Sequence, residues 1–211
     1  ADFHTNVKAD GSDIRVTESD GVNELPRQVV AINTGGQTGE LHFKANTLSS
    51  TQDTVFYIYY GNAGATEPAA SATYGSEKVW TNGYVGVRHL DESAGTTISD
   101  STSNANTGTK ISATEPNPAT GQISGAQDFD GVNDFVDITS FPTWSANEPR
   151  SVSLWFYKRT SATDTLINRA SDGIYIYVNN LSVTSYMEGN VYTFGNTSLN
   201  AWHHITWIYD G

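Results

Sequence analysis

The sequence predicts an all-β protein with two β-rich units, the second of them a two-sheet antiparallel sandwich. Three observations support this prediction. Segments rich in β-branched and aromatic residues recur along the chain, turn-forming residues separate them, and several of them alternate apolar with polar residues. No stretch has the apolar spacing of a long helix. With 211 residues the chain is long enough to bury a substantial core.

Composition excludes several classes of protein. Hydrophobic residues make up 37% of the chain, which is too many for a disordered protein. The formal net charge of −12 argues against a nucleic-acid partner, because phosphate binding needs clustered lysine and arginine. The absence of cysteine excludes disulfides, thiolate catalysis and zinc sites of the cysteine type. No apolar run approaches the roughly 18 residues that cross a bilayer, so we expect no membrane span.

Strand signals begin near the N-terminus. "DIRVT" (Asp13 to Thr17) and "RQVVAI" (Arg27 to Ile32) flank a turn signal at Asp20-Gly21. "TVFYIYY" (Thr54 to Tyr60) is continuously apolar and aromatic, which predicts a central strand covered on both faces. These segments predict a β-rich N-terminal domain over residues 1–62.

Small residues with little periodicity fill residues 63–83, which we interpret as a linker. A second unit over residues 84–211 begins with "YVGVRHL". In its "SVSLWFY" segment, Val152, Leu154 and Phe156 share one face. In its last segment, residues 202–211, the alternation continues. Short strands at this spacing, joined by turn residues, predict an antiparallel sandwich.

The order of motifs then points to a family. "DGSDIRVTESDGVNELP" and "FYIYYGN" resemble an uncharacterised β-rich domain of bacterial and phage surface proteins, which often precedes a laminin-G-like domain. "VGVRHLDE", "DSTSNANTG", "FDGVNDFVDI", "SLWFYKR" and "WHHITWIYDG" are similar, in that order, to laminin-G-like, concanavalin A-like jelly rolls. The resemblance covers nearly the whole chain. It implies a smaller β-sandwich-like unit followed by a jelly roll.

The chain departs from this pattern at both ends. The first domain lacks an upstream strand, and the jelly roll stops at "YDG", where laminin-G-like domains continue through further strands. We expect both units to be incomplete, either because the chain is a portion of a larger protein or because other chains supply the strands. The second alternative would leave β edges for self-assembly.

Two polar loops are candidate ligand sites. In "DSTSNANTG", Asp100, Asn104 and Asn106 offer oxygen atoms of the kind calcium prefers. The resemblance implies Asp100 and Asn104 as metal ligands and calcium as the cofactor; the alternative is a loop whose side chains cap their own backbone. In "FDGVNDFVDI" the Asp130-Gly131 pair favours a turn, with a ligand role for Asp130 or Asp134 as the alternative.

Catalytic patterns are missing from the sequence. Jelly-roll glycosidases commonly carry Glu-x-Asp-x-Glu on a central strand, and the chain contains neither this pattern nor a Gly-x-Ser-x-Gly elbow. The adjacent His203 and His204 point to opposite faces of a strand and cannot chelate one ion together. We therefore expect no catalytic residues and no enzyme.

Aromatic residues suggest a binding surface instead. A sugar platform could form from Trp155, Tyr157, Tyr175, Tyr177 and Tyr186. The alternative is that they fill a core or an interface between domains. We expect a non-catalytic adhesion module, extracellular or on a cell or virion surface, that recognises a glycan or a surface protein through ligand residues the sequence does not identify. The alternative is a structural subunit of a filament or capsid assembled through β edges.

Overall fold

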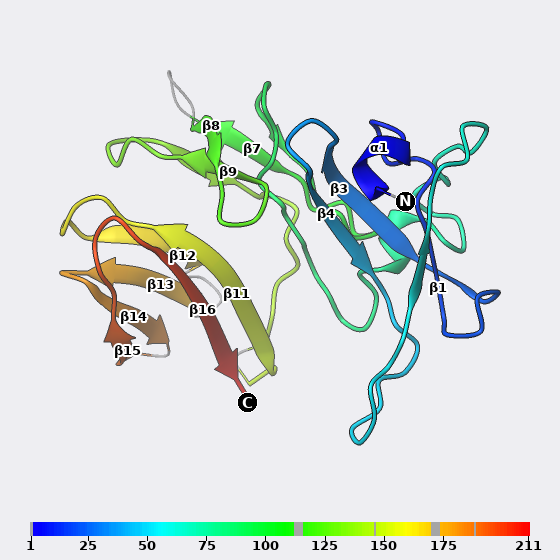
Figure 1. Cartoon of the computed structure of the whole chain (residues 1–211). Helices are drawn as coiled ribbons and strands as arrows, with labels where there is room; N and C mark the ends of the chain where they lie inside the picture. Colours follow the sequence, from blue (N-terminus) through cyan, green and yellow to red (C-terminus); the bar gives the residue numbers. More distant parts are fainter. Residues whose placement is uncertain (1, 112–115, 146, 170–173, 188) are drawn as a thin grey trace. The chain divides into compact units, whose positions relative to one another are not determined.

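The computed structural model describes residues 2–111, 116–145, 147–169, 174–187 and 189–211 (Figure 1). The contacts of the chain divide it into two compact units, Ala1–Phe141 and Pro142–Gly211. Antiparallel strands dominate both of them. The predicted all-β class is therefore confirmed, whereas the jelly-roll topology stays a prediction. Among the described residues no helix is long and apolar enough to cross a membrane.

The described residues of the first unit form four small antiparallel sheets, in the strand orders β2-β1-β5, β3-β4, β10-β7-β6 and β8-β9. Its elements are α1 (Phe3–Asn6), β1 (Arg15–Thr17), β2 (Glu24–Leu25), β3 (Arg27–Asn33), β4 (Thr38–Phe43), β5 (Tyr57–Tyr59), the 3-10 helix η1 (Ser76–Lys78), β6 (Thr97–Ile98), β7 (Gly108–Ile111), β8 (Asn117–Thr120), β9 (Gly125–Asp128) and β10 (Phe135–Asp137). The side chains of Ile14, Val16, Leu25 and Ile98 are fully buried in it.

Strand β5 corrects one expectation. The apolar run from Thr54 to Tyr60 predicted a central strand covered on both faces. In the structure β5 lies at the edge of its sheet, and Tyr57, Ile58 and Tyr59 are each nearly half exposed. A continuous apolar run indicates a covered strand only when neighbouring elements lie over both of its faces, and here they do not.

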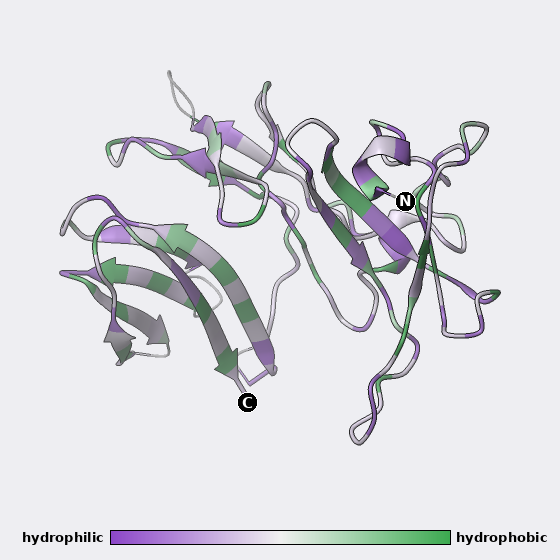
Figure 2. Cartoon of the chain, in the orientation of Figure 1, coloured by the Kyte–Doolittle hydropathy of each residue, from purple (hydrophilic) through white to green (hydrophobic). Residues whose placement is uncertain are grey.

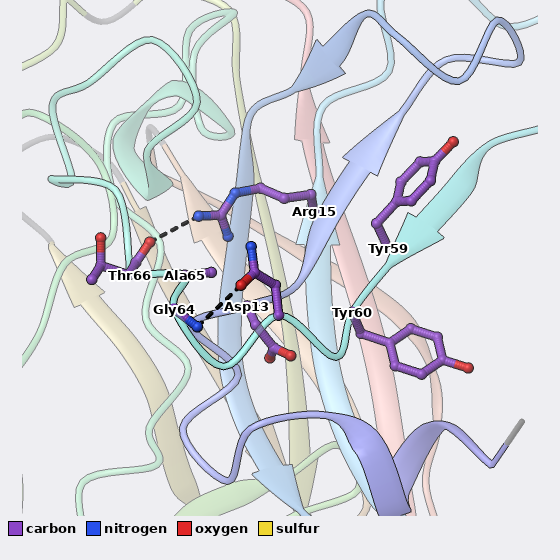
Figure 3. Close-up of a pocket in the computed structure, with 8 residues that line it drawn as sticks. Asp13, Arg15, Tyr59, Tyr60, Gly64, Ala65 and Thr66 are labelled. Carbon is purple, nitrogen blue, oxygen red and sulfur yellow. Dashed lines mark hydrogen bonds between the residues drawn. The ribbon is translucent and has the colours of Figure 1, made fainter.

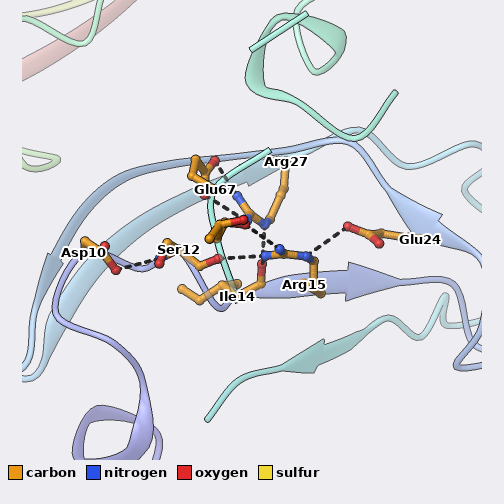
Figure 4. A network of polar contacts seen from close by, with 8 residues as sticks. Asp10, Ser12, Ile14, Arg15, Glu24, Arg27 and Glu67 are labelled. Atoms are coloured by element: carbon orange, nitrogen blue, oxygen red, sulfur yellow. Dashed lines mark hydrogen bonds and ion pairs between the residues drawn. The ribbon is translucent and has the colours of Figure 1, made fainter. Parts of the chain in front are cut away.

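The predicted linker, residues 63–83, lies within the first compact unit. Glu67 from this segment forms a bidentate ion pair with Arg27 of β3, at 2.8 and 2.9 Å (Figure 4). The Arg27 side chain is fully buried, and its Nε also donates to the carbonyl oxygen of Ile14. A compact unit can contain more than one domain, so the domain boundaries at residues 62 and 83 stay a prediction.

In the part of the second unit that the structure describes there are two antiparallel sheets, in the strand orders β12-β13-β14-β15 and β11-β16. Its strands are β11 (Arg150–Tyr157), β12 (Asp164–Arg169), β13 (Ile174–Asn179), β14 (Ser182–Met187), β15 (Asn190–Asn196) and β16 (Trp202–Tyr209). Residues 180 and 181 both have positive φ, 44° and 71°, as a two-residue turn between β13 and β14 requires.

One buried cluster joins the two sheets of this unit. It takes Phe156 from β11 and Trp207 from β16, together with Ile174, Ile176 and Val178 from β13. The alternation predicted along β11 and β16 is confirmed, and Figure 2 shows it as bands of changing hydropathy along β11. The period of two gives each strand an apolar face toward the core and an outer face toward solvent.

Candidate functional site

The predicted calcium loop places Asp100 at its centre. The Asp100 carboxylate accepts hydrogen bonds from the backbone amides of Val87 (2.9 Å), Thr102 (3.0 Å) and Asn106 (2.8 Å), and from the Thr102 hydroxyl (2.9 Å). Burial acts to raise the pKa of Asp100, but these hydrogen bonds outweigh it and the pKa lies below its usual value. Four donors therefore already surround the carboxylate.

Asn104 also has a structural contact. Its amide nitrogen donates to the carbonyl oxygens of Tyr84 and Val85, at 3.1 and 3.2 Å. Asn106 donates to the same Val85 oxygen at 2.9 Å. These contacts join the loop to residues 84 and 85, whereas the bonds from the amides of Thr102 and Asn106 to Asp100 are caps within the loop, of the kind the alternative expected. Calcium at Asp100 and Asn104 stays a prediction.

The turn interpretation of "FDGVNDFVDI" is confirmed. Asp130 accepts hydrogen bonds from the amides of Val132 (2.8 Å) and Asn133 (3.2 Å), and Asp134 accepts one from the amide of Asp130 (3.0 Å). Gly131 has a φ of 76°, which a residue with a side chain rarely adopts. The turn links β9 to β10, which pair with different strands, so it is not a two-strand hairpin.

Three of the five predicted platform residues come together on the outer face of the four-stranded sheet. Tyr175 and Tyr177 lie two apart on β13, and their rings stack at 4.9 Å with an interplanar angle of 28°. Tyr186 on β14 is directly opposite Tyr175 and is 43% exposed. We name these three residues the tyrosine face. The Tyr175 hydroxyl lies 3.2 Å from the hydroxyl of Thr165 on β12.

Trp155 and Tyr157 lie elsewhere, on the outer face of β11 in the other sheet. Both are about two-fifths exposed. Trp155 contacts the ring of His204 at 5.0 Å, and Tyr157 contacts Trp202 at 5.5 Å. The predicted platform is thus divided between two sheets of one unit.

A pocket of about 540 Å³ in the first unit is lined by residues 13, 15, 59, 60, 62 and 64–66 (Figure 3). Its charged groups already have partners. Arg15 donates to the carbonyl oxygens of Ser12 (2.9 Å), Ile14 (2.7 Å) and Thr66 (2.8 Å). Asp13 likewise accepts hydrogen bonds from the amides of residues 8 and 61, at 3.0 and 2.6 Å. The charged groups of the pocket therefore connect backbone segments of the first unit. Figure 3 shows the nearby tyrosine rings pointing away from Arg15.

Sequence reasoning missed one cluster in the first unit. Glu40 and His42 lie on β4, and His89 lies in the segment before β6. Their ligand atoms all fall within 4.8 Å of one another. Burial lowers the pKa of His89, and the Glu40 carboxylate acts in the opposite direction. In "ELHF", Glu40 and His42 lie two apart, which places them on one face if the segment is a strand. This was the one signal in the sequence for the cluster, since nothing in the sequence connects His89 to it.

Comparison with known proteins gives one match. Residues 10–103 match a family described as Domain of unknown function (DUF2341). This supports the resemblance of the first segment to an uncharacterised β-rich domain, and the matched range contains Glu40, His42 and His89. No curated protein and no solved structure is similar enough to count as a match. The laminin-G-like resemblance of the second unit stays a prediction.

Proposed function

We propose that the protein is a non-catalytic adhesion module of a cell or virion surface that binds glycans through the tyrosine face. The second unit is proposed to be a laminin-G-like jelly roll. The stacked pair of Tyr175 and Tyr177 is the observation that carries this proposal. Their β13 neighbours Ile174, Ile176 and Val178 are buried, so the two rings point away from the core.

Stacked aromatic rings suit a sugar because each ring offers a flat apolar surface for the C–H face of a pyranose, while the hydroxyl donates and accepts hydrogen bonds. Tyr186 extends the surface across the strand boundary. The neighbouring Thr165 hydroxyl adds a second hydrogen-bonding group beside Tyr175. A site of this kind orients a ligand without performing chemistry on it.

A glycan array probed with the full chain tests the proposal. We expect Tyr186→Ala to lower the affinity for the glycan that the wild type retains by about tenfold, because the substitution removes an exposed stacking ring. Tyr157→Ala is the matched control, because Tyr157 is 44% exposed, against 43% for Tyr186, but lies on the other sheet. Equal losses in both variants, or no glycan retained by the wild type, would refute the tyrosine face as the site.

One observation favours a second function, that of a structural subunit assembled through β edges. Strand β15 lies at the edge of its sheet, and all seven of its residues are exposed, including Val191 and Phe194. Such an edge is a template for pairing with another chain. If the protein assembles this way, light scattering will show oligomers that Phe194→Lys converts to monomers, because a charged side chain on an edge blocks pairing.

A further inference from the structure

The cluster of Glu40, His42 and His89 has the composition of a metal site. Residues two apart on a strand point to the same side, so β4 presents the carboxylate and one imidazole together. His42 Nε2 lies 2.6 Å and His89 Nδ1 lies 3.2 Å from the same oxygen, Glu40 Oε1. The side chains of Glu40 and His89 are only 10% and 11% exposed, whereas that of His42 is 33% exposed. An ion could therefore reach the cluster past His42.

The hydrogen-bond partners of the His89 ring favour a cation beside it. Its Nδ1 faces Glu40 Oε1, and its Nε2 lies 3.2 Å from Gln28 Oε1. Both partners are acceptor atoms, but a neutral imidazole has only one N–H to donate. One ring nitrogen would therefore direct its lone pair at an oxygen unless a proton or a metal ion lies between them.

The contacts around Gln28 determine which of its side-chain atoms faces His89. The indole N–H of Trp80 donates to Gln28 Oε1, and the Gln28 amide nitrogen donates to the Ser101 hydroxyl at 2.8 Å. Gln28 therefore presents its oxygen to His89. When the single proton of a neutral ring lies on Nε2 and is donated to this oxygen, the Nδ1 lone pair faces Glu40. A histidine whose second nitrogen is held in this way is the usual arrangement around a bound metal ion.

We propose that Glu40, His42 and His89 bind a zinc ion. Two imidazoles and one carboxylate are ligands of the type zinc takes, whereas calcium and magnesium prefer oxygen ligands throughout. Three protein ligands leave a fourth position of the tetrahedral ion for water or for an atom of a partner molecule. The site lies in the first unit and goes beyond the glycan function proposed for the tyrosine face.

The distances fit this ion after a small adjustment. Ligand atoms around a tetrahedral zinc ion lie about 3.3 Å apart, given bonds of about 2.0 to 2.1 Å. The Glu40–His89 distance of 3.2 Å already matches. Since all ligand atoms lie within 4.8 Å of one another, no pair has to move by more than about 1.5 Å. The His42 side chain is the most exposed of the three, and its ring contacts the rings of Trp80 and His89.

Calorimetric titration of zinc into the metal-stripped full chain, prepared without a histidine tag, tests the proposal. We expect one zinc ion per chain. Glu40→Gln and His42→Gln should each weaken zinc binding by more than about a hundredfold, because each removes a ligand. Gln28→Ala should weaken it by about tenfold, because Gln28 orients His89 without contacting the ion. His204→Gln is the matched control and should bind like the wild type, since His204 contacts Ser153 and Trp155 in the other unit.

Two further measurements keep the test decisive if a variant fails to fold. Cobalt added to the wild type should give the absorption spectrum of a tetrahedral ion; a spectrum of the hydrated ion overturns the proposal. Nitrogen NMR in the presence of zinc should show His89 protonated only at Nε2. Protons on both ring nitrogens would mean that an ion pair with Glu40 takes the place of the metal, and would overturn it too. So would equal zinc affinity in the wild type and Glu40→Gln.

Discussion

Asp100 shows how one carboxylate can organise a loop. It gathers three backbone amides and one hydroxyl within 3.0 Å, and these donors come from segments as far apart as Val87 and Asn106. Arg88 lies close by: burial lowers the pKa of its guanidinium and the charge of Asp100 raises it. Asp100 thus accepts hydrogen bonds from the backbone of its loop whether or not an ion also binds there.

This role predicts a pH dependence. Hydrogen bonds hold the pKa of Asp100 below its unfolded value, although burial opposes them. The resulting stability is present above an unfolded pKa of about 4 and is lost as the pH falls through the lower, folded pKa. We expect Asp100→Asn to cost about 1 kcal/mol of unfolding free energy at neutral pH, and less in acid. Denaturant unfolding at several pH values measures it.

Asp137→Asn is the control for this experiment, because Asp137 is exposed. A cost that is the same at neutral and acid pH would contradict the assigned role. Adding calcium to the metal-free chain separates the two interpretations of the loop. A capping loop leaves the unfolding midpoint unchanged, whereas a calcium site raises it in the wild type but not in Asp100→Asn.

At the scale of elements, the segment between β5 and η1 depends on an ion pair. Arg27 of β3 has a fully buried side chain, and Glu67 provides its counter-charge. Removing one partner of a buried pair leaves the other charge uncompensated. We expect Glu67→Gln to lower the unfolding free energy by about 1 to 3 kcal/mol, below the cost for a fully buried pair because Glu67 is itself 46% exposed.

Thermal and denaturant unfolding of the full chain measure this loss. Asp53→Asn, an equivalent change at an exposed position of the same unit, should have no measurable effect. An unchanged midpoint in Glu67→Gln would show that residues 63–83 behave as an independent linker, as the sequence suggested. A loss would show that they contribute to the first unit.

At the scale of the whole molecule, the two compact units suggest that the first can fold alone. Its buried Ile14, Leu25 and Ile98 lie among strands of the same unit. We expect a fragment of residues 1–141 to unfold cooperatively on heating, as followed by circular dichroism. A fragment ending at residue 103, the limit of the family match, should have a lower midpoint because it lacks β7, the partner of β6.

A disordered spectrum for the longer fragment, or equal midpoints for the two fragments, would contradict this expectation. The comparison also separates the family match from the structural unit. The match ends inside the loop that Asp100 organises, three residues before Asn106 donates to it. The structural unit continues through β10.

The sequence was sufficient to predict features that depend only on residues close together in the chain. The alternation in β11 and β16 follows from the period of two, and the turn at Asp130-Gly131 follows from residues within four positions of each other. The common face of Tyr175 and Tyr177, two of the five residues of the predicted platform, follows from the same period.

The tertiary structure decided everything that depends on which segments meet. It placed β5 at a sheet edge, divided the five aromatic residues between two sheets, and brought His89 to within 3.2 Å of Glu40, although the two are 49 positions apart in the sequence. The physical reason is that strand pairing joins residues far apart in the chain, and hydrophobic burial, which drives it, has no preferred direction. By itself the sequence determined the faces of the strands; the packing of those faces determined the sites.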